Sequence, residues 1–438
     1  VLSQGAYALN RLGEVAGDIA TIDDAMCWGF GREIGPIAAL DAIGLEQSAK
    51  LMEECKIPVP AALKQALDTT GSLYGETPAG ERTYFVPEKK GFETQARDPR
   101  HVSLPALRKQ GAIVRENLNA RLIHLGDGVL LCELDVKVVP HMNPVDDYVL
   151  GMLEQGHELC EGGEFRALVI GNQAPNFCAG ANLAAVLGLA QAGRVDLIDQ
   201  MAKKLQDLTQ RGVHAPYPVV AAPHGMTLGG GLELSHGAQV RVAHSELYCG
   251  LVEVGVGLVP AGGGCLRMLQ LQGRKTNLRK RPLGPMQKTL AAFDLIGFGR
   301  VSTSAEDAQR KGLIAREDVI VASKDEQILR AKEVALALLE GFEQRQPEPV
   351  YCPGEGGYLV MLDTIEGMAR ARQITPHSAT IAKVQARILS GGNASPVVPT
   401  DPQTILDLER EGFCELVMNP LTQARMGYML KKGKPLFN

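Results

Sequence analysis

The stretch that decides the fold is GMTLGGGLEL, residues 225–234, which directly follows the apolar run VVAA, residues 219–222. A short apolar run bounded by turn residues is typical of a buried strand. Small residues after a strand let the backbone approach a ligand closely, and the turn frees N–H groups to point at it. A helix that begins at the triple glycine adds its positive end there. The stretch therefore predicts a strand, a ligand-binding turn and a helix.

A second turn of this kind is FCAGANL, residues 177–183, which follows the predicted strand 167–170. Two such turns facing one point could hold a carbonyl oxygen that gains negative charge, and each donor is typically worth about 10²–10³ in rate. The alternative is that the glycines only permit tight packing between strand and helix. Neither turn reads GxGxxG, and the chain has no Walker loop and no GxSxG elbow.

A third stretch, YCGLVEVGVGLVPAGGG at residues 248–264, decides between these readings. Together, in this order and at about this spacing, the three stretches resemble the crotonase superfamily and, within it, the enoyl-CoA hydratases. Residues 293–300 and 305–314 look like the segment that follows in that family. The resemblance covers residues from about 120 to 312.

The resemblance implies a set of site residues. The two acid/base carboxylates fall on Glu233 and Glu253, and the oxyanion-hole N–H groups fall on Ala181 and Gly230. Family members that isomerise, cleave or decarboxylate often lack one of the two glutamates, so the pair favours hydration. Candidate substrate and coenzyme A contacts are Met142, Ala179, Gly180, Gly229, Pro260 and Ala261.

The chemistry of hydration needs these residue types. The thioester carbonyl must be polarised, a water must be held over C3, and a proton must reach C2. Two carboxyl groups around one water serve the last two needs when one is ionised and the other protonated. Close carboxyls resist joint ionisation, so their titrations should be coupled. The sequence does not assign the acid and the base, and Glu233 could instead be only a first-turn carboxylate stabilised by the helix dipole.

Several residues depart from the family pattern, and two histidines could be mistaken for catalytic bases. Asn182 stands where many relatives have Asp, Ala261 replaces a frequent glycine, and Cys265 replaces a frequent Thr. These changes bear on loop geometry and leave the predicted reaction intact. His224 and His236 lie near the glycine turn, but we interpret both as packed or surface histidines.

The densest positive run contains Arg274, Lys275, Arg279, Lys280 and Arg281. It could hold the phosphates of coenzyme A, but a solvated basic loop is the more common meaning of such a run. The sequence leaves both possibilities open.

The N-terminal stretches DAMCWGFGREIGP (residues 24–36) and DAIG (residues 41–44) resemble the helical C-terminal domain of 3-hydroxyacyl-CoA dehydrogenases. That family needs a preceding NAD-binding Rossmann domain, which these 438 residues do not contain. We therefore expect residues 1–438 to be the C-terminal portion of a bifunctional β-oxidation enzyme. No dehydrogenase site residue is transferred.

Bulk composition sets further limits. The chain is 45% apolar and 22% charged with a formal charge of -5, which is typical of a folded protein and gives no reason to expect nucleic acid. Nine cysteines without CxxC spacing argue against a zinc site or a disulfide framework and indicate a reducing compartment. No apolar run approaches a membrane span.

The predicted fold is α/β, a crotonase-like layered β/α spiral core flanked by N-terminal and C-terminal helical regions. The predicted domains are a dehydrogenase-like helical domain (1–95), a linker (96–118), a hydratase core (119–340) and a C-terminal helical region (341–438). Residues 72–118 are rich in Gly, Pro and charges and hold the best linker candidate. We expect one last helix, from residues 400–402 to a basic end at 431–433.

The predicted activity is enoyl-CoA hydration in fatty-acid β-oxidation, by a cytoplasmic enzyme that forms a homo-oligomer or assembles with other β-oxidation enzymes. The alternatives are a crotonase-fold isomerase, an acyl-CoA thioester hydrolase, and an acyl-CoA-binding module without turnover. We expect no metal, and NAD only where a Rossmann domain is present.

Overall fold

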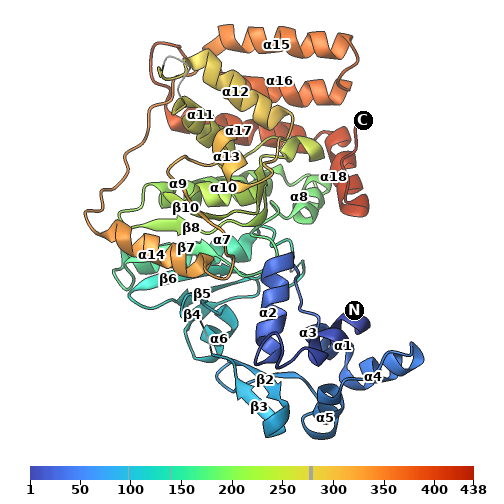
Figure 1. Ribbon diagram of the computed structural model, residues 1–438. Coiled ribbons are helices and arrows are strands. Elements are labelled where there is room, and N and C mark those ends of the chain that lie inside the picture. Colours follow the sequence, from blue (N-terminus) through green and yellow to red (C-terminus); the bar gives the residue numbers. More distant parts are fainter. Residues whose placement is uncertain (97, 140, 276–279) are drawn as a thin grey trace. The chain divides into compact units, whose positions relative to one another are not determined.

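A seven-stranded sheet organises the larger of two compact units in the computed structural model (Figure 1). The structure describes residues 1–96, 98–139, 141–275 and 280–438, and the larger unit comprises residues 100–102 and 113–438. The strand order is β12-β10-β8-β7-β6-β5-β4. From β6 to β12 each strand pairs with its neighbour in parallel. The pairs β4–β5 and β5–β6 are antiparallel. The bounds are β4 (Ile113–Glu116), β5 (Ala120–His124), β6 (Val129–Leu134), β7 (Ala167–Gly171), β8 (Val219–Ala221), β10 (Val240–His244) and β12 (Val319–Val321).

Both faces of this sheet are covered by helices, as buried parallel strands require. Side chains alternate between the two faces along a strand. On β6, Leu130 and Cys132 pack into one apolar cluster with α7 (Asp147–Glu161). Between them, Leu131 points to the opposite face, where it lies with Ile328 of α14 (Gln327–Leu339) beside Gly171. The sheet therefore holds the site-bearing turns on a rigid, two-sided core.

A second, two-stranded parallel sheet gathers the three sequence stretches. It pairs β9 (Gly225–Leu228) with β11 (Leu247–Gly250), and isolated bridges join Cys178 to Thr227 and Val145 to Ala181. The helix α10 (Gly230–His236) and the 3₁₀-helix η2 (Glu253–Val256) begin directly after its two strands. The predicted strand at 219–222 and the helix from the triple glycine are confirmed as β8 and α10, whereas residues 225–228, expected in the turn between them, form β9.

Further helices of this unit contribute to a large apolar cluster with residues of the central stretches. They are α8 (Leu183–Gln191), α9 (Val195–Val213), α11 (Gly264–Gly273), α12 (Pro285–Gly297), α13 (Ala305–Lys311), α16 (Pro376–Ser390), α17 (Pro402–Val417) and α18 (Pro420–Lys432). The helix α15 (Gly354–Arg370) packs against α16 in a smaller cluster, through Met361 and Ile365.

The prediction of one last helix is wrong, because α17 and α18 are separate helices. Asn419 caps α18 by accepting the Leu421 N–H, and Pro420 occupies its first turn. Proline lacks an N–H and clashes with the carbonyl four residues earlier, so a helix cannot run through it undisturbed. The predicted start is confirmed: Asp401 caps α17 and Pro402 is its first residue.

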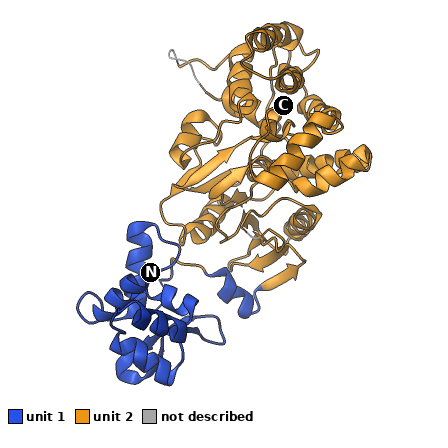
Figure 2. Cartoon of the chain, turned by 90° about the vertical axis from the view of Figure 1, so that its right-hand side faces the viewer, with its two compact units in different colours: residues 1–99, 103–112 blue, residues 100–102, 113–438 orange. Residues whose placement is uncertain are grey.

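The smaller unit comprises residues 1–99 and 103–112 (Figure 2). Its helices are α1 (Leu2–Asn10), α2 (Ile19–Phe30), α3 (Ala38–Ile43), α4 (Leu45–Glu54), α5 (Ala61–Thr69) and α6 (Leu104–Lys109), with a 3₁₀-turn η1 (Pro87–Lys89). A three-stranded antiparallel sheet joins β1 (Tyr74–Glu76), β2 (Arg82–Val86) and β3 (Gly91–Thr94). Phe85 of β2 is buried in the same core as the helices. The stretch 72–118, named above as holding the best linker candidate, thus holds this sheet, α6 and β4.

Two aspartates, the buried Asp23 and the half-buried Asp41, tie this unit together. Asp23 accepts the N–H groups of Ile37 and Ala38 and the Tyr74 hydroxyl. Asp41 accepts the N–H groups of Leu73 and Tyr74.

In the described part of the chain, every helix is too short or too polar to cross a lipid bilayer.

Candidate functional site

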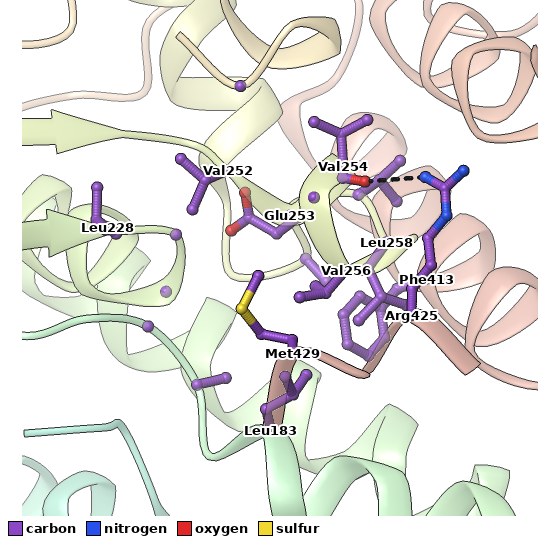
Figure 3. A pocket seen from close by; sticks show the side chains of 18 of the residues that line it. Leu183, Leu228, Val252, Glu253, Val254, Val256, Leu258, Phe413, Arg425 and Met429 are labelled. Carbon is purple, nitrogen blue, oxygen red and sulfur yellow. Dashed lines mark hydrogen bonds between the residues drawn. The ribbon is translucent and has the colours of Figure 1, made fainter. Parts of the chain in front are cut away.

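A cavity of about 860 Å³ opens where the three sequence stretches meet. Its walls are mostly apolar, and Figure 3 shows the Glu253 carboxyl among the side chains of Leu228, Val252 and Met429. Nine of the ten predicted site residues line it: Met142, Ala179, Gly180, Ala181, Gly229, Gly230, Glu233, Glu253 and Ala261.

Pro260 is the exception. It is buried and lies behind the wall, where an added Cβ on Gly264 would meet its side chain at 2.9 Å. Its ring supports the turn that carries Ala261, and its role as a substrate contact stays a prediction.

The backbone N–H groups of Ala181 and Gly230 lie close together. A Cβ built on Gly230 would stand 3.3 Å from the Ala181 nitrogen. The Val145 N–H donates to the Gly180 carbonyl, and the Val145 carbonyl accepts the Asn182 N–H. Because these two bonds flank Ala181, its own N–H points away from the bridge. Gly230 is the first residue of α10, and the N–H groups of a helix's first turn have no partner within the helix. The pair can therefore donate to one oxygen in the cavity.

Glycine is required where these turns approach. A Cβ on Gly231 would stand 2.1 Å from the carbonyl oxygen of Cys178, so any side chain would force the two turns apart. Gly229 has φ +52°, which L-residues rarely adopt, and its Cβ would stand 2.8 Å from Glu253 Oε1. The glycines serve close packing and ligand approach together.

Glu233 is buried near the start of α10. Its Oε1 accepts the N–H groups of Gly262 and Gly264 at 2.7 and 2.8 Å. Burial raises the pKa of Glu233 to about 7, against the opposing effect of these two bonds. The carboxyl is thus poised to exchange a proton near neutral pH.

Glu253 lies at the start of η2, and its Oε2 is buried without a hydrogen-bond partner among the residues that the structure describes. Burial raises the pKa of Glu253 well above its ordinary value, and the neighbouring carboxyl of Glu233 raises it further. One free carboxyl oxygen in an apolar cavity is available to a bound water.

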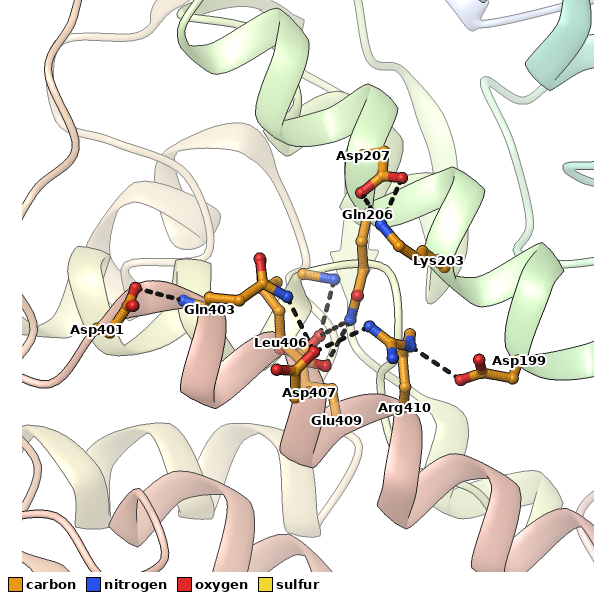
Figure 4. Close-up of polar contacts among 11 residues, drawn as sticks. Asp199, Lys203, Gln206, Asp207, Asp401, Gln403, Leu406, Asp407, Glu409 and Arg410 are labelled. Carbon is orange, nitrogen blue, oxygen red and sulfur yellow. Dashed lines mark hydrogen bonds and ion pairs between the residues drawn. The ribbon is translucent and has the colours of Figure 1, made fainter.

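A third buried carboxyl, Glu409 of α17, completes the cluster, and the sequence analysis missed it. Its Oε2 accepts the Gly263 N–H at 2.9 Å and the Gln206 amide at 3.2 Å, and its Oε1 accepts the Leu266 N–H at 2.9 Å. Figure 4 shows Gln206 of α9 reaching it. Burial raises the pKa of Glu409 to about 8, helped by Glu233. One signal existed, since Glu409 falls four residues after Ile405, on the buried helix face.

Both histidines are packed, as expected. Nε2 of His224 lies 2.8 Å from the Ala174 carbonyl, and burial lowers the pKa of His224 to about 4. Nε2 of His236 lies 2.7 Å from the Leu313 carbonyl. Asn182 caps α8 through Ala185.

The described residues of the basic run do not line the apolar cavity. Arg274 pairs with Glu317 and Glu348, and Lys275 donates to the Lys311 carbonyl. None of Arg274, Lys275, Lys280 and Arg281 lines the cavity, and Arg279 lies outside the described residues.

Known proteins resemble the chain in both of its units. Residues 149–338 match the family described as enoyl-CoA hydratase/isomerase. A Bacillus subtilis protein named "Probable 3-hydroxyacyl-CoA dehydrogenase" is 36% identical over 433 residues, covering 99% of this chain and 53% of the relative. A "Probable enoyl-CoA hydratase" of the same organism is 29% identical over 210 residues, which are 48% of this chain and 71% of the relative. This chain thus spans about half the length of the first of these relatives.

The fold has solved counterparts. A carnitinyl-CoA dehydratase from Mycobacterium thermoresistibile superposes with a TM-score of 0.50 at 16% identity, covering 73% of this chain and 91% of that one. The C-terminal part of the chain therefore has the crotonase fold, and its residues 149–338 are similar to the enoyl-CoA hydratase/isomerase family. The N-terminal region is similar to a protein named as a 3-hydroxyacyl-CoA dehydrogenase.

Proposed function

Taking residues 149–338 as a crotonase-fold domain of the hydratase/isomerase family, we propose that the protein hydrates trans-2-enoyl-CoA to 3-hydroxyacyl-CoA in fatty-acid β-oxidation. The observation that carries the proposal is the meeting of two carboxyls in one apolar cavity beside the backbone N–H groups of Ala181 and Gly230. Glu233 is buried, and Glu253 is half-buried with its Oε2 shielded from solvent.

The reaction begins with the thioester oxygen accepting the N–H groups of Ala181 and Gly230, which draws electron density from C3. A water held between Glu233 and Glu253 attacks C3, and the ionised carboxylate takes its proton. The protonated carboxyl delivers its own proton to C2, so the pair ends with one proton again. The raised pKa values of both groups support a single shared negative charge near neutral pH.

The cavity walls support an acyl-CoA substrate. Met142, Ala179, Gly180, Gly229 and Ala261 offer small or apolar surfaces around the thioester, and apolar side chains from α8, α9 and the C-terminal helices continue the wall. An aliphatic acyl chain would be buried there without leaving polar groups unpaired.

The N-terminal unit extends the proposal. Its similarity to a relative named as a dehydrogenase supports a role in oxidation of the 3-hydroxyacyl product, which requires NAD and a Rossmann domain. Nine free cysteines support action in a reducing compartment such as the cytoplasm, and homo-oligomerisation or assembly with other β-oxidation enzymes belongs to the same proposal.

Product analysis tests the reaction. Incubation with trans-2-enoyl-CoA should give 3-hydroxyacyl-CoA, and incubation with 3-enoyl-CoA should give little 2-enoyl product. The opposite preference would identify an isomerase, free coenzyme A would identify a thioester hydrolase, and tight binding without turnover would identify a binding module.

A further inference from the structure

A second, polar cavity of about 370 Å³ lies outside the proposed acyl site. Three arginines line it: Arg267 of α11, Arg274 directly after the end of α11, and Arg345 from the segment after α14. None of the three lines the apolar cavity. A volume of this size is within the range of small-molecule pockets.

Arg267 has the features of an unoccupied ligand group. Its side chain is 6% exposed, and only Nη1 has a partner, the Gln270 Oε1 at 3.3 Å. Its Nε and Nη2 are buried and form no hydrogen bond within the described residues. These two atoms make the side edge of the guanidinium, which binds phosphate or carboxylate through two parallel hydrogen bonds. A buried donor without a partner is costly unless a ligand or water occupies the position.

The charges around this cavity are unbalanced. The two carboxylates that line it, Glu317 and Glu348, both pair with Arg274. Arg267 and Arg345 are left without an ion pair in the part of the chain that the structure describes. Burial lowers the pKa of Arg267 to about 9, so the side chain keeps its charge at neutral pH. An anion in the cavity would offset both charges.

We propose that this cavity binds a small oxyanion of the phosphate class, held by the Nε–H and Nη2–H of Arg267 and by the charge of Arg345. The cavity leaves room beyond one phosphate group, so the ligand is inorganic phosphate or the phosphate of a small ester. The site is independent of the hydratase reaction, since its residues take no part in that chemistry.

Isothermal titration calorimetry of the whole chain tests the site, with inorganic phosphate as the probe and chloride balancing ionic strength. The wild-type protein should show one saturable site. Arg267→Gln removes the two-pronged donor and should weaken binding at least about tenfold. Arg345→Gln should weaken phosphate binding by a smaller factor. Because Arg345 is partly exposed, this variant still tests the site if Arg267→Gln does not fold.

Arg310→Gln is the matched control, because it removes the same charge from a side chain that is 76% exposed on α13, and binding should not change. A parallel titration with methyl phosphate identifies the source: equal or tighter binding indicates a phosphate ester, and weaker binding indicates free phosphate. No saturable heat in the wild type, or equal binding by the wild type and both arginine variants, would overturn the proposal. So would an equal loss in Arg310→Gln.

Discussion

Glu233 and Glu409 hold the same turn from two sides. Glu233 accepts the N–H groups of Gly262 and Gly264, and Glu409 accepts those of Gly263 and Leu266. The turn leads into α11, whose positive end favours negative charge on both carboxyls, while burial opposes it. A C-terminal helix thereby helps to fix the position of a proposed catalytic carboxyl.

Replacing Glu409 tests this link. Glutamine has one acceptor oxygen, so Glu409→Gln leaves one of the two backbone N–H groups facing an amide NH₂ and should cost about 1–3 kcal/mol of stability. The shifted turn should lower kcat for hydration by between about tenfold and a hundredfold. Loss of the neighbouring charge should also lower the pKa of Glu253. The limb of the pH–rate profile that reports the titration of Glu253 should therefore shift to lower pH.

The matched control is Glu411→Gln, two residues along the same helix and exposed. It should keep the wild-type rate and pH profile. A Glu409→Gln enzyme with the wild-type pH profile would show that Glu409 serves only the packing of α17.

Stability should depend on pH through the same group. A carboxyl whose pKa is higher in the folded state binds more protons there, so its stabilising contribution is complete below the unfolded pKa and is lost as pH rises through the folded value. For Glu409 the loss runs from about 4.5 to about 8. The difference in melting temperature between the wild type and Glu409→Gln should therefore shrink as pH rises through this window, because only the wild type loses this contribution. A constant difference would mean that the pKa of Glu409 is not raised.

Gly229 is predicted to be intolerant of any side chain. Gly229→Ala forces a Cβ to within 2.8 Å of Glu253 Oε1 at a φ of +52°, at a cost of about 1–3 kcal/mol in backbone strain. Steady-state kinetics should show kcat lowered at least about tenfold, because Glu253 must move. Gly188→Ala is the control: its Cβ meets nothing within 4 Å in α8, and both rate and stability should be kept or improved.

Local signals made much of the hydratase-like core predictable. The hairpin of β5 and β6 turns at Gly126, Asp127 and Gly128, all three at positive φ, and such turn residues between two apolar runs are a local signal for a hairpin. Glycine turns after buried strands predict ligand-binding turns, and cap residues such as Asp401 predict helix starts. Both signals lie within a few positions of the element that they predict.

What the sequence did not reveal depends on distant partners. The sheet β1–β3 packs Phe85 against helices from earlier in the chain, and its charged strands show little periodicity. Glu409 meets its N–H donors 143 and 146 positions away, so a local reading finds only a glutamate on a helix. The unpaired atoms of Arg267 are likewise visible only in three dimensions.

The most direct test of the central claim is the hydration rate of a trans-2-enoyl-CoA, followed by the loss of enone absorbance, for the wild type, Glu233→Gln and Glu253→Gln. Each variant loses one acid–base group and keeps the size of the side chain, so each should lower kcat at least about a hundredfold. Ordinary turnover by both variants would contradict the account.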